Sequence, residues 1–337
     1  MHNIKNHAIM KRKLAFLALL LAFMGCQKES APKIVSTREV THDDKVIVEA
    51  TFKDGKQLYF QLLSPNTASV TSGWQFSQEA GYYWKCYGGM VIPSEFEHNE
   101  QLYSVTCIEN SAFQNCNKLS SITIPNRVTS IGEAAFMNCS DLQAVELPTA
   151  LDCVRSYTFA GCKLLSAIDF PERLRHIESC AFSGCEALSS IKLPESLEFV
   201  GGGVFEQCIR LVSVEMGSGL KTLPEGLFDG CCYLTEVKMP AVERVNETAF
   251  RNCTALQSIE LPATLQRLKG RAFVGCSSLT SVTCYATTPP STYYDTEPVG
   301  DPFQGCPIEE IKVPMASAST YRNTLGWRRY ADKIVGM

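Results

Sequence analysis

The chain has 337 residues, of which 45% are apolar and 20% are charged, and its formal net charge at pH 7 is −4. This composition is typical of a folded soluble protein, and the length is enough for two or three ordinary domains. The small negative charge argues against a nucleic-acid partner and against adhesion to anionic membranes through a basic surface.

The first 25 residues have the pattern of a signal peptide. The basic residues Lys5, Lys11, Arg12 and Lys13 precede an unbroken apolar run at 14–24. A helix needs about 20 residues to cross a bilayer, so this run is too short to span one, but it suits a signal-peptide core. We therefore assign 1–25 to a lipoprotein signal peptide.

Cys26 follows Gly25 directly after the apolar run, and this arrangement resembles a bacterial lipobox, with Phe23 where leucine is usual. We predict that Cys26 is lipidated and anchors the mature chain in the outer membrane, since each buried CH₂ contributes about 0.8 kcal/mol. A signal peptide cleaved nearby without lipid, or a retained anchor, are the alternatives. The segment 27–30 (QKES) resembles an export tag of surface lipoproteins, which favours the cell surface over the periplasm.

A tether and a small β unit follow the lipidation site. Residues 26–38 are polar and aperiodic, so we assign them to the tether. Over 39–90 we predict antiparallel strands at 45–52, 57–62 and 67–71, with a hairpin turn at 53–56 (KDGK). A solenoid needs a cover for its first rung and its open strand edge, and we interpret this unit as that N-terminal β cap.

Nine Phe-x-x-Cys units then recur, from Phe113/Cys116 to Phe303/Cys306, at steps of 23, 23, 23, 23, 23, 22, 23 and 30 residues. Self-similarity at this period indicates a solenoid, which we place at 91–314, with a C-terminal cap at 315–337. In the unit 119–139 (LSSITIPNRVTSIGEAAFMNC), apolar residues alternate as in a strand with one buried face, and a proline ends the strand. Such strands stack in parallel at about 4.8 Å per rung.

The repeat consensus L-x-x-I-x-I-P-x-x-V-x-x-I-G-x-x-A-F-x-x-C is similar to the BspA-type leucine-rich repeat of bacterial surface lipoproteins. The resemblance extends from about residue 91 to residue 337. It implies a leucine-rich-repeat solenoid of the α/β horseshoe class, rich in β structure, and a role in binding or adhesion without catalysis. The glycine at Gly132 is retained only at Gly201, so we expect a turn there whose shape varies between repeats.

Nine of the sixteen cysteines occupy one repeat column. Equivalent Cβ atoms of stacked rungs lie about 4.8 Å apart and point the same way, whereas a disulfide needs converging Cβ atoms about 3.8 Å apart. We therefore predict a buried ladder of small apolar side chains. Pairing among the other cysteines, such as Cys86, stays open.

No catalytic or metal-binding pattern emerges from the remaining residues. His42, His98 and His176 share no motif, the glycines at 201–203 lack the lysine of a phosphate loop, and the sequence contains no Cys-x-x-Cys. A hydrolase would need paired carboxylates or a nucleophile with a base. We predict that the protein is not an enzyme and uses no metal or other cofactor.

The outward position of each repeat strand forms a candidate binding face. The column holds Thr123, Glu146, Asp169, Lys192, Glu215, Lys238 and Glu260. Its charges alternate in sign from Asp169 to Glu260, and each such pair stabilises a stack by a few tenths of a kcal/mol. The face is therefore either solvated and self-complementary or a flat polar docking sheet for a protein, without the aromatic anchors that binding hot spots usually have.

The 30-residue step predicts a loop insertion at 287–301, which contains Tyr293 and Tyr294. Long loops on regular scaffolds often carry function. We treat the two tyrosines as a candidate binding loop, with packing over the last rung as the alternative.

These features predict a non-catalytic recognition or adhesion protein at the cell surface that binds a protein, such as an extracellular-matrix ligand. Membrane contact is expected only through the N-terminal lipid. The alternative is a glycan-binding accessory lipoprotein of a nutrient-capture system. A broad polar face favours protein, whereas exposed aromatic side chains stacked over a groove would favour glycan.

Overall fold

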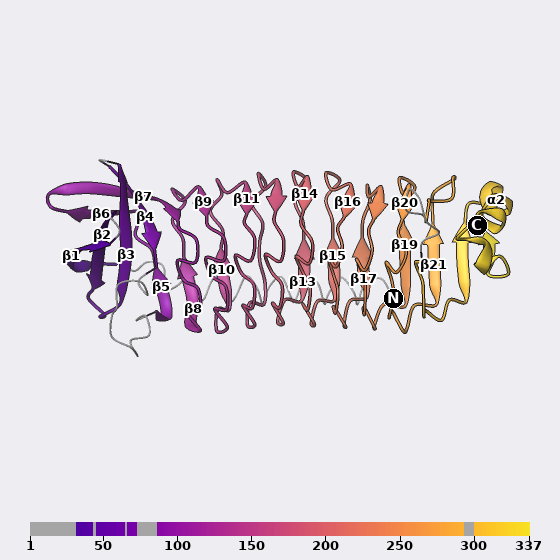
Figure 1. Cartoon of the computed structure of the whole chain (residues 1–337), viewed down its shortest axis with the longest axis horizontal. Helices are drawn as coiled ribbons and strands as arrows, with labels where there is room; N and C mark the ends of the chain where they lie inside the picture. Colours follow the sequence, from indigo (N-terminus) through magenta and orange to yellow (C-terminus); the bar gives the residue numbers. More distant parts are fainter. Residues whose placement is uncertain (1–31, 43–44, 65, 73–85, 293–299) are drawn as a thin grey trace, which may run out of the picture.

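The computed structural model describes residues 32–42, 45–64, 66–72, 86–292 and 300–337. Figure 1 shows an elongated molecule in which the repeats stack along the long axis, between a β cap at one end and the helix α2 (Ala318–Asn323) at the other. The predicted leucine-rich-repeat solenoid is therefore confirmed. In the described ranges, none of the helices combines the length and the apolar character that a membrane span requires.

The N-terminal cap is a mixed sheet that continues into the solenoid. Its strands β1 (Ile34–His42), β2 (Lys45–Phe52), β3 (Gln57–Ser64) and β4 (Thr67–Thr71) pair antiparallel in chain order. β4 then pairs in parallel with β7 (Gln101–Ile108), which also pairs with β6 (Glu95–His98) and with β9 (Ser130–Ile131). The sheet therefore crosses the boundary that we placed between residues 90 and 91.

The start of the cap corrects one expectation from the sequence. Residues 34–38, which we assigned to the tether, form the first half of β1. β1 is the edge strand of its sheet and none of its described side chains is fully buried. It therefore lacks the apolar alternation by which a half-buried strand is recognised.

The two ends of the cap sheet meet through His98. This β6 side chain is only 5% exposed, and its ring nitrogens lie 2.9 Å from Thr37 Oγ1 and 2.9 Å from Glu39 Oε1, both on β1. Phe96, also on β6, stacks on Phe60 of β3 with ring centroids 4.3 Å apart. The β6–β7 hairpin thus folds over the cap and closes its core.

Two columns of parallel strands run along the solenoid. The long-strand column contains β5 (Tyr87–Val91), β8 (Lys118–Thr123), β10 (Ala144–Glu146), β13 (Ser190–Lys192), β15 (Ser213–Glu215), β17 (Glu236–Lys238), β19 (Ser258–Leu261), β21 (Ser281–Cys284) and β22 (Glu310–Val313). The short-strand column contains β9, β11 (Cys153–Val154), β12 (His176–Ile177), β14 (Phe199–Val200), β16 (Thr222–Leu223), β18 (Arg244–Val245) and β20 (Arg267–Leu268). Equivalent residues face each other, as Val214 and Val237 do, so each apolar column becomes continuous.

The core between the columns is a stack of phenylalanine rings. From Phe113 to Phe303, successive ring centroids lie 4.9 to 5.8 Å apart, and all nine rings are buried. Eight of the nine cysteines in the column beside them are buried, as predicted, and Cys306 is half-buried. The thiols of this column also donate hydrogen bonds, as Cys139 Sγ does to the carbonyl oxygen of Phe113 at 3.1 Å. Burial raises the pKa of the Cys208 thiol to about 12, so this thiol stays protonated at neutral pH.

The C-terminal cap ends the stack with a strand of its own. It consists of η1 (Met315–Ser317), α2, η2 (Arg328–Tyr330) and β23 (Ile334–Gly336), and β23 pairs in parallel with β22. The buried Trp327 packs edge-on against Phe303, with ring centroids 6.2 Å apart. The cap thus covers the end of the ring stack.

The predicted insertion is narrower than 287–301. Ser291 bridges Arg267 in parallel, as the next short strand would, and Trp327 Nε1 donates to the carbonyl oxygen of Pro290 at 2.9 Å. Residues 287–292 therefore follow the path of an ordinary repeat under the C-terminal cap. Arg267 and Ser291 are 24 residues apart, so one of the seven extra residues of the 30-residue step lies before Ser291 and six lie after it.

Candidate binding face

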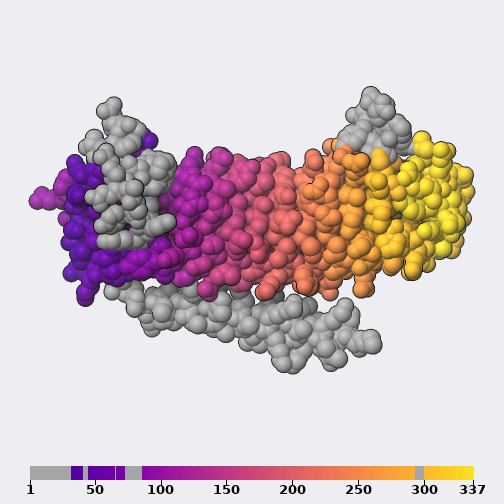
Figure 2. All heavy atoms as spheres, turned by 60° about the horizontal axis from the view of Figure 1, so that its bottom comes forward, coloured from indigo at the N-terminus to yellow at the C-terminus, as the bar shows by residue number. Residues whose placement is uncertain are grey.

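The long-strand column presents a polar face to solvent. Its outward side chains Glu146, Asp169, Lys192, Glu215, Lys238 and Glu260 are exposed, and Thr123 is half-buried. Figure 2 shows the repeats packed side by side into one continuous rod. The sequence therefore placed these seven side chains on the correct side of the strands, and the pleat that alternates buried and exposed positions is the reason.

Only part of the predicted ladder of charge pairs forms. Glu215 lies between two lysines, 3.4 Å from Lys192 Nζ and 3.8 Å from Lys238 Nζ. All three side chains are at least half exposed, so each pair contributes at most about 1 kcal/mol. In the described ranges, the neighbouring pairs Asp169–Lys192 and Lys238–Glu260 do not come within ion-pair distance.

The missing pairs coincide with two breaks in the strand ladder. Residues 165–170 form no strand, which separates β10 from β13. β17 and β19 do not pair, and the 22-residue step lies between them. Hydrogen-bonded strands hold equivalent side chains at contact distance. Among the described residues, the predicted pairs between successive repeats therefore form only inside the intact sheet of β13, β15 and β17.

The first break leaves two neighbouring acids without a cation. Glu146 and Asp169 occupy equivalent positions in successive repeats, and like charges at such positions destabilise a ladder. Phe170 replaces the usual aliphatic residue, stays half-buried and meets Phe182 edge-on at 5.6 Å. Partial desolvation raises the pKa of Asp169. In the described part of the chain, neither acid lies within ion-pair distance of a basic side chain.

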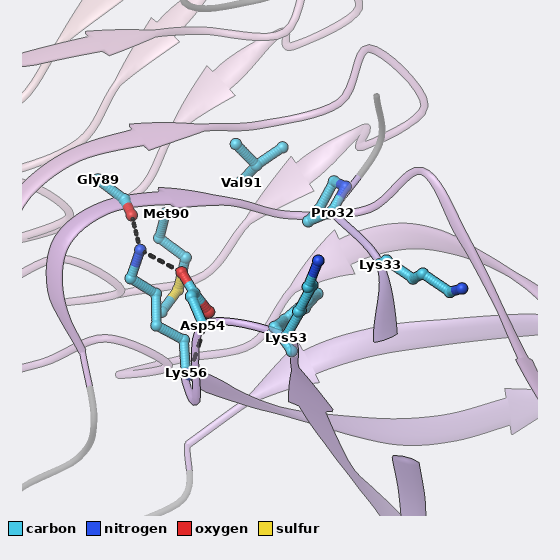
Figure 3. A pocket seen from close by; sticks show the side chains of 9 residues that line it. Pro32, Lys33, Lys53, Asp54, Lys56, Gly89, Met90 and Val91 are labelled. Carbon is cyan, nitrogen blue, oxygen red and sulfur yellow. Dashed lines mark hydrogen bonds and ion pairs between the residues drawn. The ribbon is translucent and has the colours of Figure 1, made fainter. Parts of the chain in front are cut away.

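A pocket of about 240 Å³ lies at the N-terminal end of this face (Figure 3). It is lined by Pro32, Lys33, Phe52, Lys53, Asp54, Lys56, Gly89, Met90 and Val91. Val91 pairs in register with Thr123, so the pocket opens beside the first outward position of the long-strand column. The sequence pattern predicted the lysine-bearing turn at 53–56 but not this pocket.

Two glycines of β5 shape the pocket. Gly88 has a φ of +67°, which favours glycine, and the strand register shifts between Gly88 and Gly89. A Cβ on Gly89 would lie 2.8 Å from Ser121 Oγ, closer than side chains tolerate. The carbonyl oxygen of Gly89 accepts a hydrogen bond from Lys56 Nζ at 2.7 Å, and the same ammonium lies 2.8 Å from Asp54 Oδ2.

The other polar clusters are structural. Cys153 Sγ lies 3.7 Å from Glu178 Oε1, and Cys153 pairs in register with His176. Burial and the nearby Glu178 carboxylate raise the pKa of Cys153 to about 11, so the thiol is not a ready nucleophile at neutral pH. No group of three or more His, Cys, Asp or Glu side chains in the described ranges is arranged to hold a metal ion.

Two further predicted sites lie outside the described residues. These are the lipidation site Cys26 and the candidate loop residues Tyr293 and Tyr294.

Comparisons with known proteins agree with this architecture. The sequence profile of the BspA type leucine rich repeat region matches residues 106–235 and 221–297, in six copies. The chain belongs to this family. Comparison with the curated proteins gave no match.

Two solved structures are similar to this chain. A leucine-rich repeat protein of T. pallidum is 30% identical with a TM-score of 0.50, and the match covers 58% of this chain and 86% of that one. A leucine rich cell surface protein from Faecalibacterium prausnitzii A2-165 is 20% identical with a TM-score of 0.52, covering 84% of this chain and 90% of that one. The second likeness shows the shared fold alone.

Proposed function

We propose that this BspA-type repeat protein is an exported surface protein whose long-strand face docks a protein partner, without catalysis. The observation that carries the proposal is the pair Glu146 and Asp169, exposed in successive repeats without a basic neighbour in the described ranges. A face that served only its own stability would neutralise these charges, as Glu215 does with its two lysines. Unpaired charges of one sign instead suit a partner of opposite charge.

The distribution of exposed aromatic residues favours a protein ligand over a glycan. Tyr157, Phe199, Tyr233 and Tyr285 are 41%, 51%, 63% and 42% exposed. A fifth aromatic residue, Tyr87, is 47% exposed and pairs in register with Lys118. Its position is equivalent to that of Tyr233 but lies six repeats away, and the other three occupy different positions within their repeats, so the five rings form no stack along the rod. A stacked aromatic platform over a groove, which we expect for a glycan site, is therefore not formed by the described side chains.

Charge reversal on the face tests the proposal. We expect E146K/D169K to lower binding to the matrix proteins that the wild-type chain captures from a purified panel by at least tenfold, because two attractive contacts become repulsive. The control E133K/E225K makes the same change in net charge at two exposed turn residues outside the long-strand column. Surface plasmon resonance measures both.

The contrary results are equally distinct. Equal loss in both variants would attribute binding to net charge and not to this face. If the same protein binds only sugars on a glycan array, the protein-docking function is wrong and the glycan-binding alternative is supported.

A further inference from the structure

The pocket beside β5 holds two lysines that lack an acidic partner. Lys33 and Lys53 line the pocket, and neither lies within ion-pair distance of a carboxylate in the described ranges, whereas Lys56 pairs with Asp54. The backbone N–H of Lys53 donates to the carbonyl oxygen of Lys33 at 3.2 Å, which holds the two residues side by side. Figure 3 shows the Lys53 side chain extending toward Pro32, whereas the Lys33 side chain extends to the side, away from the other labelled residues.

The rest of the lining combines apolar side chains with the Lys56–Asp54 ion pair and Gly89. Phe52 and Met90 are 5% and 4% exposed, and Pro32 and Val91 complete the wall. A volume of about 240 Å³ is below the range of about 300 to 1,000 Å³ that is usual for whole small-molecule ligands. Ammonium groups beside an apolar wall suit a carboxylate on a short apolar stem, since charge-assisted hydrogen bonds to carboxylates are the stronger kind.

The position of the pocket relates it to the acids of the face. Val91 at the pocket aligns with Thr123, and Glu146 and Asp169 follow in the next two repeats. At about 4.8 Å per rung, these acids lie about 10 to 15 Å from Val91 along the stack. The N-terminal third of the face therefore has a positive end and a negative centre.

We propose that this pocket binds an acidic side chain or terminal carboxylate of the protein partner, while a basic residue of the same partner segment pairs with Glu146 and Asp169. This inference rests on the proposed docking function. An extended segment advances about 3.3 Å per residue, so the acidic and basic residues of the partner are three or four positions apart. The two opposite charges fix the direction in which the segment lies.

Selection of displayed peptides tests this inference while the partner itself is unidentified. A random peptide library on phage is selected against the full chain in non-ionic detergent, and against the variants K33E/K53E and E146K/D169K. The control K45E/K221E reverses two exposed lysines outside the pocket lining, of which Lys45 lies in the same cap. Thermal unfolding curves verify that all variants remain folded.

We expect wild type and control to enrich peptides with an acidic residue three or four positions from a basic one. K33E/K53E should lose the acidic preference and bind those peptides at least tenfold more weakly. E146K/D169K should lose the basic preference and keep the acidic one. Together these shifts would assign one charge to each half of the site.

Three results would overturn the inference. Equal binding of the peptides to wild type and K33E/K53E would exclude the pocket as a binding site but would not contradict docking on the long-strand face. Failure to enrich any peptide would contradict both the pocket and the proposed docking function. Flotation with phosphatidylglycerol vesicles that is lost in K33E/K53E, without an acidic peptide preference, would assign the lysines to lipid headgroups.

Discussion

At the scale of single residues, the phenylalanine stack dominates the stability of the rod. Phe205 is fully buried, and its ring centroid lies 5.8 Å from those of both Phe182 and Phe228. We expect F205A to lower the free energy of unfolding by about 3 to 5 kcal/mol, the range for a large buried aromatic residue. Chemical denaturation of the purified chain measures this change.

Phe199 provides the matched control. It lies six residues before Phe205 but is 51% exposed on β14. We expect F199A to change the free energy of unfolding by no more than about 0.5 kcal/mol. Similar losses in both variants would contradict the assignment of stability to the ring stack.

The spacing of the repeats predicted which residues form these columns. It did not predict the hydrogen bonds that their backbone carbonyl groups accept. The phenylalanine and cysteine positions follow from the 23-residue period. The hydrogen bond from Cys139 to the carbonyl oxygen of Phe113 reaches back 26 residues, so it depends on the offset between stacked repeats. The residue before each cysteine adopts positive φ, as Asn138 and Gly161 do at 61° and 73°. Asparagine and glycine tolerate that conformation best. One or the other occupies this position in eight of the nine repeats, with Gln207 as the exception, and this preference was the available signal.

At the scale of elements, the sequence predicted β2, β3 and β4 but missed β1, which has no fully buried side chain, and β6, which has two. Buried and less buried positions alternate in parts of β2 and β3, whereas β4 has three consecutive buried residues. The breaks in the long-strand column also escaped prediction. One break lies where like charges occur in successive repeats, and the other lies where one repeat is a residue short. The free-energy cost of each irregularity depends on contacts between neighbouring repeats, which the sequence does not give.

The contact between β6 and β1 gives an element-scale prediction. His98 is 5% exposed and hydrogen-bonded to Thr37 and Glu39. Removing one partner of a buried hydrogen bond costs about 1 to 3 kcal/mol, and about 1.4 kcal/mol corresponds to a tenfold change. We therefore expect H98A to speed hydrogen exchange of the β1 amides by about tenfold, with the solenoid unchanged, as measured by mass spectrometry.

His176 supplies the control for this experiment, since it is exposed on β12 in the solenoid. H176A should leave exchange in β1 at the wild-type rate. If β1 exchanges equally fast in the wild type and H98A, the cap edges are held together by other contacts.

At the scale of the whole molecule, the sequence predicted the rod and its caps. The pocket could be recognised only from the three-dimensional structure. Lys33 and Lys53 adjoin because β1 and β2 pair, and both meet Val91 only where the cap lies beside β5. None of the three carries a motif. Their relation to Glu146 and Asp169 depends on the stacking direction, which brings residues far apart in sequence onto one surface.

The position of the cap also bears on how the rod is presented. If Cys26 carries the lipid, six residues separate it from Lys33, and the seven Cα-to-Cα steps span at most about 25 Å. The pocket and the first repeats would then stay close to the membrane, and the face beyond them would be open to a partner. Lipidation of Cys26 is therefore the prediction on which this presentation depends.

We expect C26A to release the protein from membranes, because acyl chains attached to this residue supply the membrane affinity. Fractionation of cells into membrane and soluble proteins measures the effect. The control C232A changes a half-buried cysteine outside the repeat column and should stay in the membrane fraction. Retention of C26A in membranes would indicate an uncleaved N-terminal anchor. Wild-type protein in the soluble fraction would instead indicate cleavage without lipid.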